Sequence, residues 1–505
     1  MKLKSVFTFT LLLFVFQQAN SQNRILPVDT TVVTQDKVTV NGALINYTVT
    51  TGTQPVWDEA GKPIASLHYT YYTRNNVQNK EHRPLVISFN GGPGSASVWM
   101  HLAYTGPRIL NIDDEGYPLQ PYGFKENPYS ILDVADIVYV NPVNTGYSRM
   151  IPADGEGVDR KQFFGINADI TYLAEWLNTF VTRNNRWLSP KYLIGESYGG
   201  VRVAGLSLAL QNRHWMYLNG VIMVSPADYK ILRSDNLESQ VLSLPYFAAT
   251  AWYHKQLAPA LQQKDLYDIL PEVEDFTINE LMPAIAKGGF IEETERKAIT
   301  QKVAFYSGLT EKEILQHNLV VPTSYFWKAL LRDKSGKTIG RLDSRYLGID
   351  KMEAGTSPDY SAELTSWLHS FTPAINHYFQ NDLGFKTDIK YNMFGNVRPW
   401  DMENDNTRDD LRQAMAQNPY LNVLFQSGYY DGATTYFHAK YTMWQMDPSG
   451  KLKDRLDFKG YRSGHMMYLR REDLKKSNED LREFILKTKA LWRSMSNIKV
   501  DINFL

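Results

Sequence analysis

A serine between two glycines, placed directly after an apolar run, most constrains how this chain can fold. The residues Gly195-Glu196-Ser197-Tyr198-Gly199 follow Tyr192-Leu193-Ile194. This pattern predicts a strand that turns sharply into a helix and presents the Ser197 hydroxyl at the edge of a sheet. Glycines suit such a turn because its torsions are strained and the strand and helix approach too closely for side chains. The same five-residue pattern also arises by chance in surface turns, so its context must support it.

The composition excludes several classes of protein. The chain has 505 residues, 43% of them hydrophobic, which is enough for one large domain with an insertion or for two domains. Lysine and arginine (54) balance aspartate and glutamate (54), so there is no basic excess to favour a nucleic-acid partner. With no cysteine, the chain has no disulfide, thiol nucleophile or thiolate zinc site.

The N-terminus has the pattern of an export signal. Lys2 and Lys4 precede the apolar run from Val6 to Phe16, and small residues follow up to Ser21. We therefore expect residues 1–21 to be a cleaved signal peptide and the mature protein to be periplasmic or extracellular. The apolar run is shorter than the ~20 residues that span a bilayer, and no later segment is long enough, so we expect no stable membrane insertion after cleavage.

Two kinds of strand pattern occur in the first half of the chain. Lys37 to Thr50 and Ile64 to Thr73 alternate apolar and polar residues, which predicts antiparallel strands. Three later runs are continuously apolar and end in Gly, Asn or Pro loops: Leu85–Phe89, Asp136–Val140 and Tyr192–Ile194. Such runs are typical of buried parallel strands whose functional loops lie at their carboxyl ends.

Helical patterns alternate with these strands and then replace them. Residues 167–181 have the helical spacing of a crossover helix, another helix should follow Ser197, and 220–225 should be the next strand. From about 234 to 390 helical patterns dominate, including a capping-box pattern that begins at Thr310.

Strand patterns return at 421–425 and 456–458, and a final helix should start near Ser477. We therefore expect an α/β fold in which helices flank a central, mostly parallel sheet. The expected division is a core from 22–233 and 391–505 with a mainly helical cap insertion at 234–390.

The partners of Ser197 follow from chain order. Sites built on such an elbow take an acid and then a histidine from loops after later strands. Of the ten histidines only His438 and His465 follow the strand at 421–425, and we expect His438 in the next helix. We therefore predict His465 as the base and Asp431, in the Gly-rich loop after that strand, as the acid that orients it. The alternative role for Asp431 is to form the turn, as aspartates in Gly-rich turns often do. Competing acids that precede the strand are Asp401, Asp405, Asp409 and Asp410.

A glycine-rich loop, Asn90-Gly91-Gly92-Pro93-Gly94, ends the strand that begins at Leu85. Acyl transfer needs backbone N–H groups aimed at the developing oxyanion, and glycines let the main chain approach it. We predict the amides of Gly92 and Tyr198 as these donors. A phosphate-binding loop is the alternative, but no Lys-Ser/Thr follows the glycines.

Together these motifs resemble the serine carboxypeptidase family. The resemblance extends over nearly the whole mature chain and is carried by residues 90–97, 141–148 and 195–200, Asp431 in its loop, and Gly464-His465-Met466-Met467-Tyr468.

The resemblance implies an α/β-hydrolase fold, a helical cap and release of C-terminal amino acids from peptides through an acyl-enzyme, with no metal or organic cofactor. It further implies that Asn90, Gly91 and Glu196 bind the free C-terminal carboxylate of the peptide. A carboxyl beside that anion is tolerable when the two share a proton. The alternative role for Glu196 is favourable electrostatics at a helix start.

Three positions depart from the family pattern. Tyr104 replaces a second glutamate, Ser95 a usual cysteine, and Val140 a common acidic residue. Loss of the second glutamate weakens recognition of a free carboxylate, so a related acyltransferase, esterase or amidase is the alternative function. A third hypothesis is a secreted binding protein with a silent site, which the intact set of Ser197, Asp431 and His465 disfavours.

Overall fold

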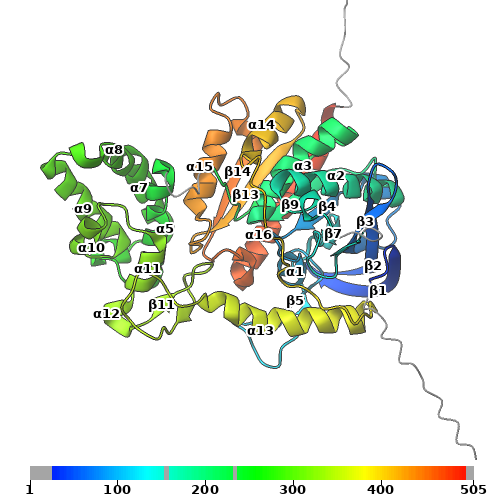
Figure 1. Cartoon of the computed structure of the whole chain (residues 1–505), viewed down its shortest axis with the longest axis horizontal. Helices are drawn as coiled ribbons and strands as arrows, with labels where there is room; N and C mark the ends of the chain where they lie inside the picture. The colour runs from blue at the N-terminus through cyan, green and yellow to red at the C-terminus, as the bar shows by residue number, and fades with distance from the viewer. Residues whose placement is uncertain (1–25, 153–157, 231–235, 496–505) are drawn as a thin grey trace, which may run out of the picture.

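One large mixed sheet organises the protein (Figure 1). A computed structural model describes residues 26–152, 158–230 and 236–495, so the predicted signal segment lies outside the described residues. Within them the sheet has ten strands in the order β1-β2-β3-β7-β4-β9-β10-β13-β14, with β8 paired to β3.

The first strands of the sheet are antiparallel, as the alternating patterns predict. They are β1 (Thr30–Val40), β2 (Ala43–Trp57), β3 (Pro63–Arg74) and the short β8 (Arg149–Met150). Asn41 and Gly42 form the turn between β1 and β2 with positive φ of 47° and 82°. The pattern at 37–50 is therefore one hairpin, because Asn and Gly tolerate these torsions. A separate hairpin consists of β5 (Arg108–Leu110) and β6 (Phe124–Glu126).

The other strands pair in parallel and confirm the expected fold class. They are β7 (Asp136–Val140), β4 (Leu85–Phe89), β9 (Lys191–Glu196), β10 (Gly220–Val224), β13 (Asn422–Gly428) and β14 (Leu456–Tyr461). Helices cover both faces of these strands, which explains their continuous apolar sequences. The loops after β4, β9, β13 and β14 leave the same edge of the sheet.

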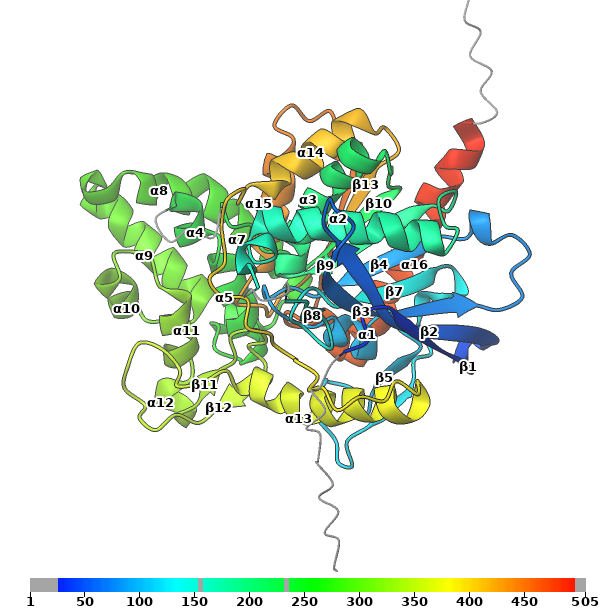
Figure 2. The same cartoon turned by 45° about the vertical axis from the view of Figure 1, so that its right-hand side comes forward.

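Each face of the sheet has its own hydrophobic cluster, and neighbouring residues of a strand alternate between them. Leu193 packs on one face, whereas Tyr192 and Ile194 pack on the other. The first face is covered by α2 (Ile166–Arg183), α3 (Tyr198–His214), α14 (Thr407–Gln417) and α15 (Tyr436–Met446). The second is covered by α1 (Val98–Ala103), α13 (Ala362–His377) and α16 (Arg471–Met495), and Figure 2 shows α2 and α13 on opposite sides.

Short helices fill most of the region between β10 and α13 and extend to the left in Figure 1. They are α4 (Leu237–Val241), α5 (Leu244–Tyr253), α6 (Pro259–Gln262), α7 (Leu266–Phe276), α8 (Met282–Ala286), α9 (Glu293–Ser307), α10 (Glu311–Gln316), α11 (Thr323–Ala329) and α12 (Arg332–Ser335). Thr310 forms the predicted capping box with Glu313. Two short strands, β11 (Thr338–Ile339) and β12 (Leu347–Gly348), follow.

Packing within residues 234–390 falls into two parts. Apolar side chains from Val241 to Ile339 form a third cluster, together with residues of the β13–α15 region. Those from Tyr346 to Phe385 instead join α1 on the sheet. The division at 234 and 390 stays a prediction.

The final helix begins at Arg471, earlier than the predicted start near Ser477. Its first turns are mostly polar and carry little periodic signal. None of the described helices has the length and apolar character needed to cross a bilayer.

Candidate active site

The sharp turn at Ser197 joins β9 to α3. Ser197 has φ 60° and ψ −124°, a strained conformation that its amide helps to fix by donating to the Val224 carbonyl at 2.9 Å. A Cβ added to Gly195 would lie 2.1 Å from the Gly199 carbonyl oxygen, and one added to Gly199 would lie 3.0 Å from the Phe89 oxygen. Only glycine fits these two positions without movement of the backbone.

Asp431 lies in the loop after β13 and is fully buried. Its Oδ1 accepts the amides of Ala433 and Thr434 at 2.8 and 3.1 Å. Its Oδ2 accepts the Thr434 hydroxyl at 2.8 Å and lies 2.7 Å from Nδ1 of His465. These donors compensate the burial of a carboxylate and fix its orientation toward the imidazole.

His465 lies in the loop after β14, beside the loop of Asp431. Its backbone is held from two sides, because its amide donates to Leu342 at 2.7 Å and its carbonyl accepts the Ser225 hydroxyl at 2.8 Å. Burial by itself lowers the pKa of His465, but the charge and hydrogen bond of Asp431 more than offset this, so the pKa lies above its ordinary value. The ring is therefore set up to accept a proton.

Ser197 and His465 both line one cavity of about 410 Å³. Asp431 lies behind the imidazole and does not line the cavity. The structure thus brings the serine, histidine and acid of the sequence prediction to one site.

Two residues that line the same cavity have a backbone amide without an internal partner among the described residues. Gly92, with φ +107°, and Tyr198, the first residue of α3, both line it. Among the described residues neither amide donates a hydrogen bond to another protein group. The glycine loop is tied to α3 by Arg202, which donates to the Asn90 carbonyl at 2.6 Å and pairs with Asp169 at 2.7 Å.

Glu196 is nearly fully buried, yet it lines the cavity beside Gly91. Its Oε1 accepts Nδ2 of Asn90 at 2.9 Å, and its Oε2 accepts the Tyr468 hydroxyl. Burial raises the pKa of Glu196 to about 7 against the lowering effects of the His465 charge and of these two donors. Asn90 itself is fully buried behind Glu196 and does not line the cavity.

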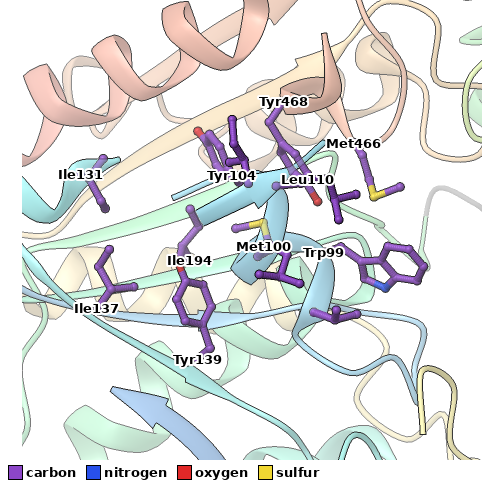
Figure 3. Packing of buried hydrophobic residues seen from close by; sticks show 14 of the residues in the cluster. Trp99, Met100, Tyr104, Leu110, Ile131, Ile137, Tyr139, Ile194, Met466 and Tyr468 are labelled. Carbon is purple, nitrogen blue, oxygen red and sulfur yellow. The ribbon is translucent and has the colours of Figure 1, made fainter. Parts of the chain in front are cut away.

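Tyr104, which replaces the expected second glutamate, makes no hydrogen bond to Glu196. Its hydroxyl donates to Gln426 at 2.7 Å. Its ring stacks on Tyr468 with centroids 4.7 Å apart and planes 11° apart, and the two rings lie together in Figure 3. Tyr104 therefore supports the ring whose hydroxyl contacts Glu196.

The rival residues lie elsewhere. His438 is buried on α15 and outside the cavity lining, with Thr435 as its hydrogen-bond partner. Asp401 is exposed and caps its own turn through the Glu403 amide at 2.9 Å. No group of three His, Cys, Asp or Glu side chains in the described residues could hold a metal ion.

A segment that precedes α13 closes the site on the side of the two late loops. The Arg341 carbonyl accepts the Gly432 amide at 3.0 Å, the Leu342 carbonyl accepts His465, and the Ser344 amide donates to the Tyr430 carbonyl at 2.9 Å. This arrangement and the Tyr468 contact were not predicted from the sequence. Both join residues far apart in the chain, for which no local pattern exists.

A family model described as serine carboxypeptidase (peptidase S10) matches residues 57–458. The chain is 32% identical to the retinoid-inducible serine carboxypeptidase of Homo sapiens over 173 residues, which is 34% of each chain. It is 29% identical to serine carboxypeptidase-like 36 of Arabidopsis thaliana over 193 residues, 35% of this chain and 37% of the relative. The matched segments thus span about a third of these relatives' length.

A solved structure supports the fold over a longer range. A prohormone-processing carboxypeptidase from Saccharomyces cerevisiae superposes with a TM-score of 0.54 at 14% identity, covering 87% of this chain and 91% of the other. At this identity the likeness concerns the fold alone.

Proposed function

Because the chain belongs to the serine carboxypeptidase family, we propose that it is a serine-type carboxypeptidase that removes C-terminal amino acids from peptides. The observation that carries this proposal is the joint position of Ser197, the His465–Asp431 pair and Glu196 at one cavity. Such a cavity offers a nucleophile, a base and a group for a terminal carboxylate in one place.

The proposed reaction has two steps. The Ser197 hydroxyl attacks the carbonyl carbon of the last peptide bond while Nε2 of His465 takes its proton, and Asp431 stabilises the imidazolium. The amides of Gly92 and Tyr198 bind the oxyanion. Collapse of the intermediate breaks the C–N bond, and His465 protonates the departing amino acid. Water then attacks the acyl-enzyme by the same proton transfers and frees the shortened peptide and Ser197.

We further propose that Gly91 and Glu196 select the free C-terminus, with Asn90 acting through Glu196. Glu196 supports this role because it lines the cavity as a carboxyl with a pKa near 7. In its protonated form it donates to the carboxylate of the peptide, and in its ionised form it repels that carboxylate. Recognition is therefore expected at and below neutral pH.

The decisive experiment compares a blocked dipeptide with its C-terminal amide at pH 6. We expect kcat/KM to be at least about 10-fold higher for the free acid, the equivalent of one charge-assisted hydrogen bond. The blocked amino acid, which both substrates release when the last peptide bond is cleaved, is measured by chromatography. Equal turnover of both substrates would overturn the carboxypeptidase proposal and leave an esterase or amidase. Ester formation with an added alcohol would point to an acyltransferase.

Tyr468→Phe is expected to shift the pH dependence of this discrimination. The Tyr468 hydroxyl lowers the pKa of Glu196, so its removal raises that pKa from about 7 by about one unit. Since the protonated form binds, the acid-to-amide preference should persist to a pH about one unit higher than in the wild type. The ratio of kcat/KM for acid and amide is measured from pH 5 to pH 9.

Tyr104→Phe is the matched control, because it removes the other hydroxyl of the stacked pair, which contacts Gln426. In this variant the pH at which the acid-to-amide preference is half lost should stay within about 0.3 pH units of the wild-type value. An unshifted profile in Tyr468→Phe would contradict the proposed role of Glu196.

We propose that the protein is exported and that residues 234–390 act as a cap. Support for export comes from Lys2 and Lys4 ahead of the apolar run in the first 21 residues. Support for the cap comes from Arg341, Leu342 and Leu364, which belong to this region and line the cavity.

A further inference from the structure

Arg341 places a positive charge in the wall of the active-site cavity. Of the described side chains that line the cavity, three belong to ionisable residues, namely Glu196, Arg341 and His465. Most of the other lining side chains are apolar, aromatic or hydroxyl-bearing, among them Trp99, Leu364, Trp367 and Phe394. The mostly uncharged wall around Arg341 screens its charge little, which favours an anionic group of the substrate.

The Arg341 guanidinium is not used to hold the fold together. Arg186, Arg202 and Arg345 are buried and paired with aspartates at 2.6–2.7 Å. Arg341 is exposed, and within the described residues no hydrogen bond or ion pair engages its side chain. Glu363 is near enough for the charge of Arg341 to lower its pKa, but it is buried and its Oε1 accepts the Leu342 amide at 2.8 Å.

The backbone of Arg341, in contrast, is firmly anchored. Its carbonyl accepts the Gly432 amide, and the Gly340 amide before it donates to the Tyr346 carbonyl at 2.9 Å. The next residue, Leu342, is held by Glu363 on one side and by His465 on the other. The guanidinium is thus an unpaired cation on a fixed stretch of chain directly beside the loops of the acid and the histidine.

We propose that Arg341 binds an acidic side chain in one of the two peptide residues that flank the cleaved bond, so that the preferred substrates are acidic at that position. This inference rests on the proposed carboxypeptidase function. The terminal carboxylate itself is assigned to Gly91, in the loop after β4, and to Glu196, the last residue of β9, whereas the backbone of Arg341 is bonded to the loop after β13. Charge-assisted, often bidentate pairing makes arginine well suited to a carboxylate.

The test uses blocked dipeptides with Glu or Gln in the last position and, separately, in the penultimate position. For the wild type we expect kcat/KM to favour Glu over Gln by about 10-fold at one of the two positions. Arg341→Gln should abolish this preference, and Arg341→Glu should favour Lys there instead. Lys334→Gln is the control, because it removes an exposed positive charge from the same region without lining the cavity. It should keep the wild-type preference.

Two results would overturn the inference. Wild-type enzyme that treats Glu and Gln alike at both positions has no acidic preference to explain. An equal loss on all peptides in Arg341→Gln would assign Arg341 to the terminal carboxylate instead. Calorimetric titration of the same peptides into Ser197→Ala and Ser197→Ala/Arg341→Gln decides the matter without turnover. If no peptide is hydrolysed the proposed function fails, while the binding difference between Glu and Gln peptides still tests Arg341.

Discussion

Ser197→Ala is expected to lower kcat for a blocked dipeptide by a factor on the order of 10⁵ to 10⁶, because the variant lacks the hydroxyl on which the proposed acyl-enzyme forms. The variant should fold as the wild type does, since alanine retains the Cβ and the backbone bond to Val224. Residual hydrolysis is measured by chromatography after long incubation, and folding by circular dichroism and thermal unfolding.

Ser95→Ala provides the matched control for this variant. Ser95 lines the same cavity, but its hydroxyl accepts Nε1 of Trp99 at 2.8 Å. We expect its kcat to change by less than about 10-fold, the worth of one ordinary hydrogen bond. Full activity in Ser197→Ala would refute the assignment of the nucleophile.

Asp431→Asn is expected to lower kcat by about 10⁴-fold while leaving the geometry of the loop intact. The amide oxygen can still accept from Ala433 and Thr434, but the amide NH₂ facing Nδ1 favours the wrong tautomer of His465. The pKa of His465 should fall, because the charge and hydrogen bond of Asp431 are what raise it. In the pH profile of the residual activity, the loss of activity on the acid side should therefore occur at a lower pH than in the wild type.

The comparison for this variant is Asp401→Asn, which alters an exposed aspartate of the sequence's competing group. It should retain kcat within about 2-fold. Steady-state kinetics over a pH series measures both effects. A loss smaller than about 10-fold in Asp431→Asn would show that His465 does not depend on this carboxylate.

The central strands could be predicted from the sequence, and the candidate site residues could be proposed from it, because their signals are mostly local. A buried parallel strand such as β9 needs a short apolar run, and the elbow needs glycines at Gly195 and Gly199 within five residues. The order of Ser197, Asp431 and His465 follows from strand order. The strand and the elbow come from backbone constraints that each short segment satisfies by itself, whereas the order of the three residues depends on the strand order of the whole sheet.

The contacts around Glu196 could not be predicted from the sequence in the same way. Tyr468 donates to a residue 272 positions away, and the Tyr104 hydroxyl turns toward a glutamine 322 positions away. The resemblance to the family identified Tyr104 as one of three departures from the family pattern but could not give the direction of its side chain. That direction depends on the stacking of two rings brought together only by the complete fold.

The hydrogen bonds that the Arg341–Ser344 segment makes to the loops of Asp431 and His465 have a consequence for protein engineering. A truncation that removed all of residues 234–390 would leave the amides of Gly432 and His465 and the carbonyl of Tyr430 without their partners. A shortened or chimeric enzyme should therefore retain this segment and exchange only the helices that precede it. The backbone of the histidine loop would then keep its partner at Leu342.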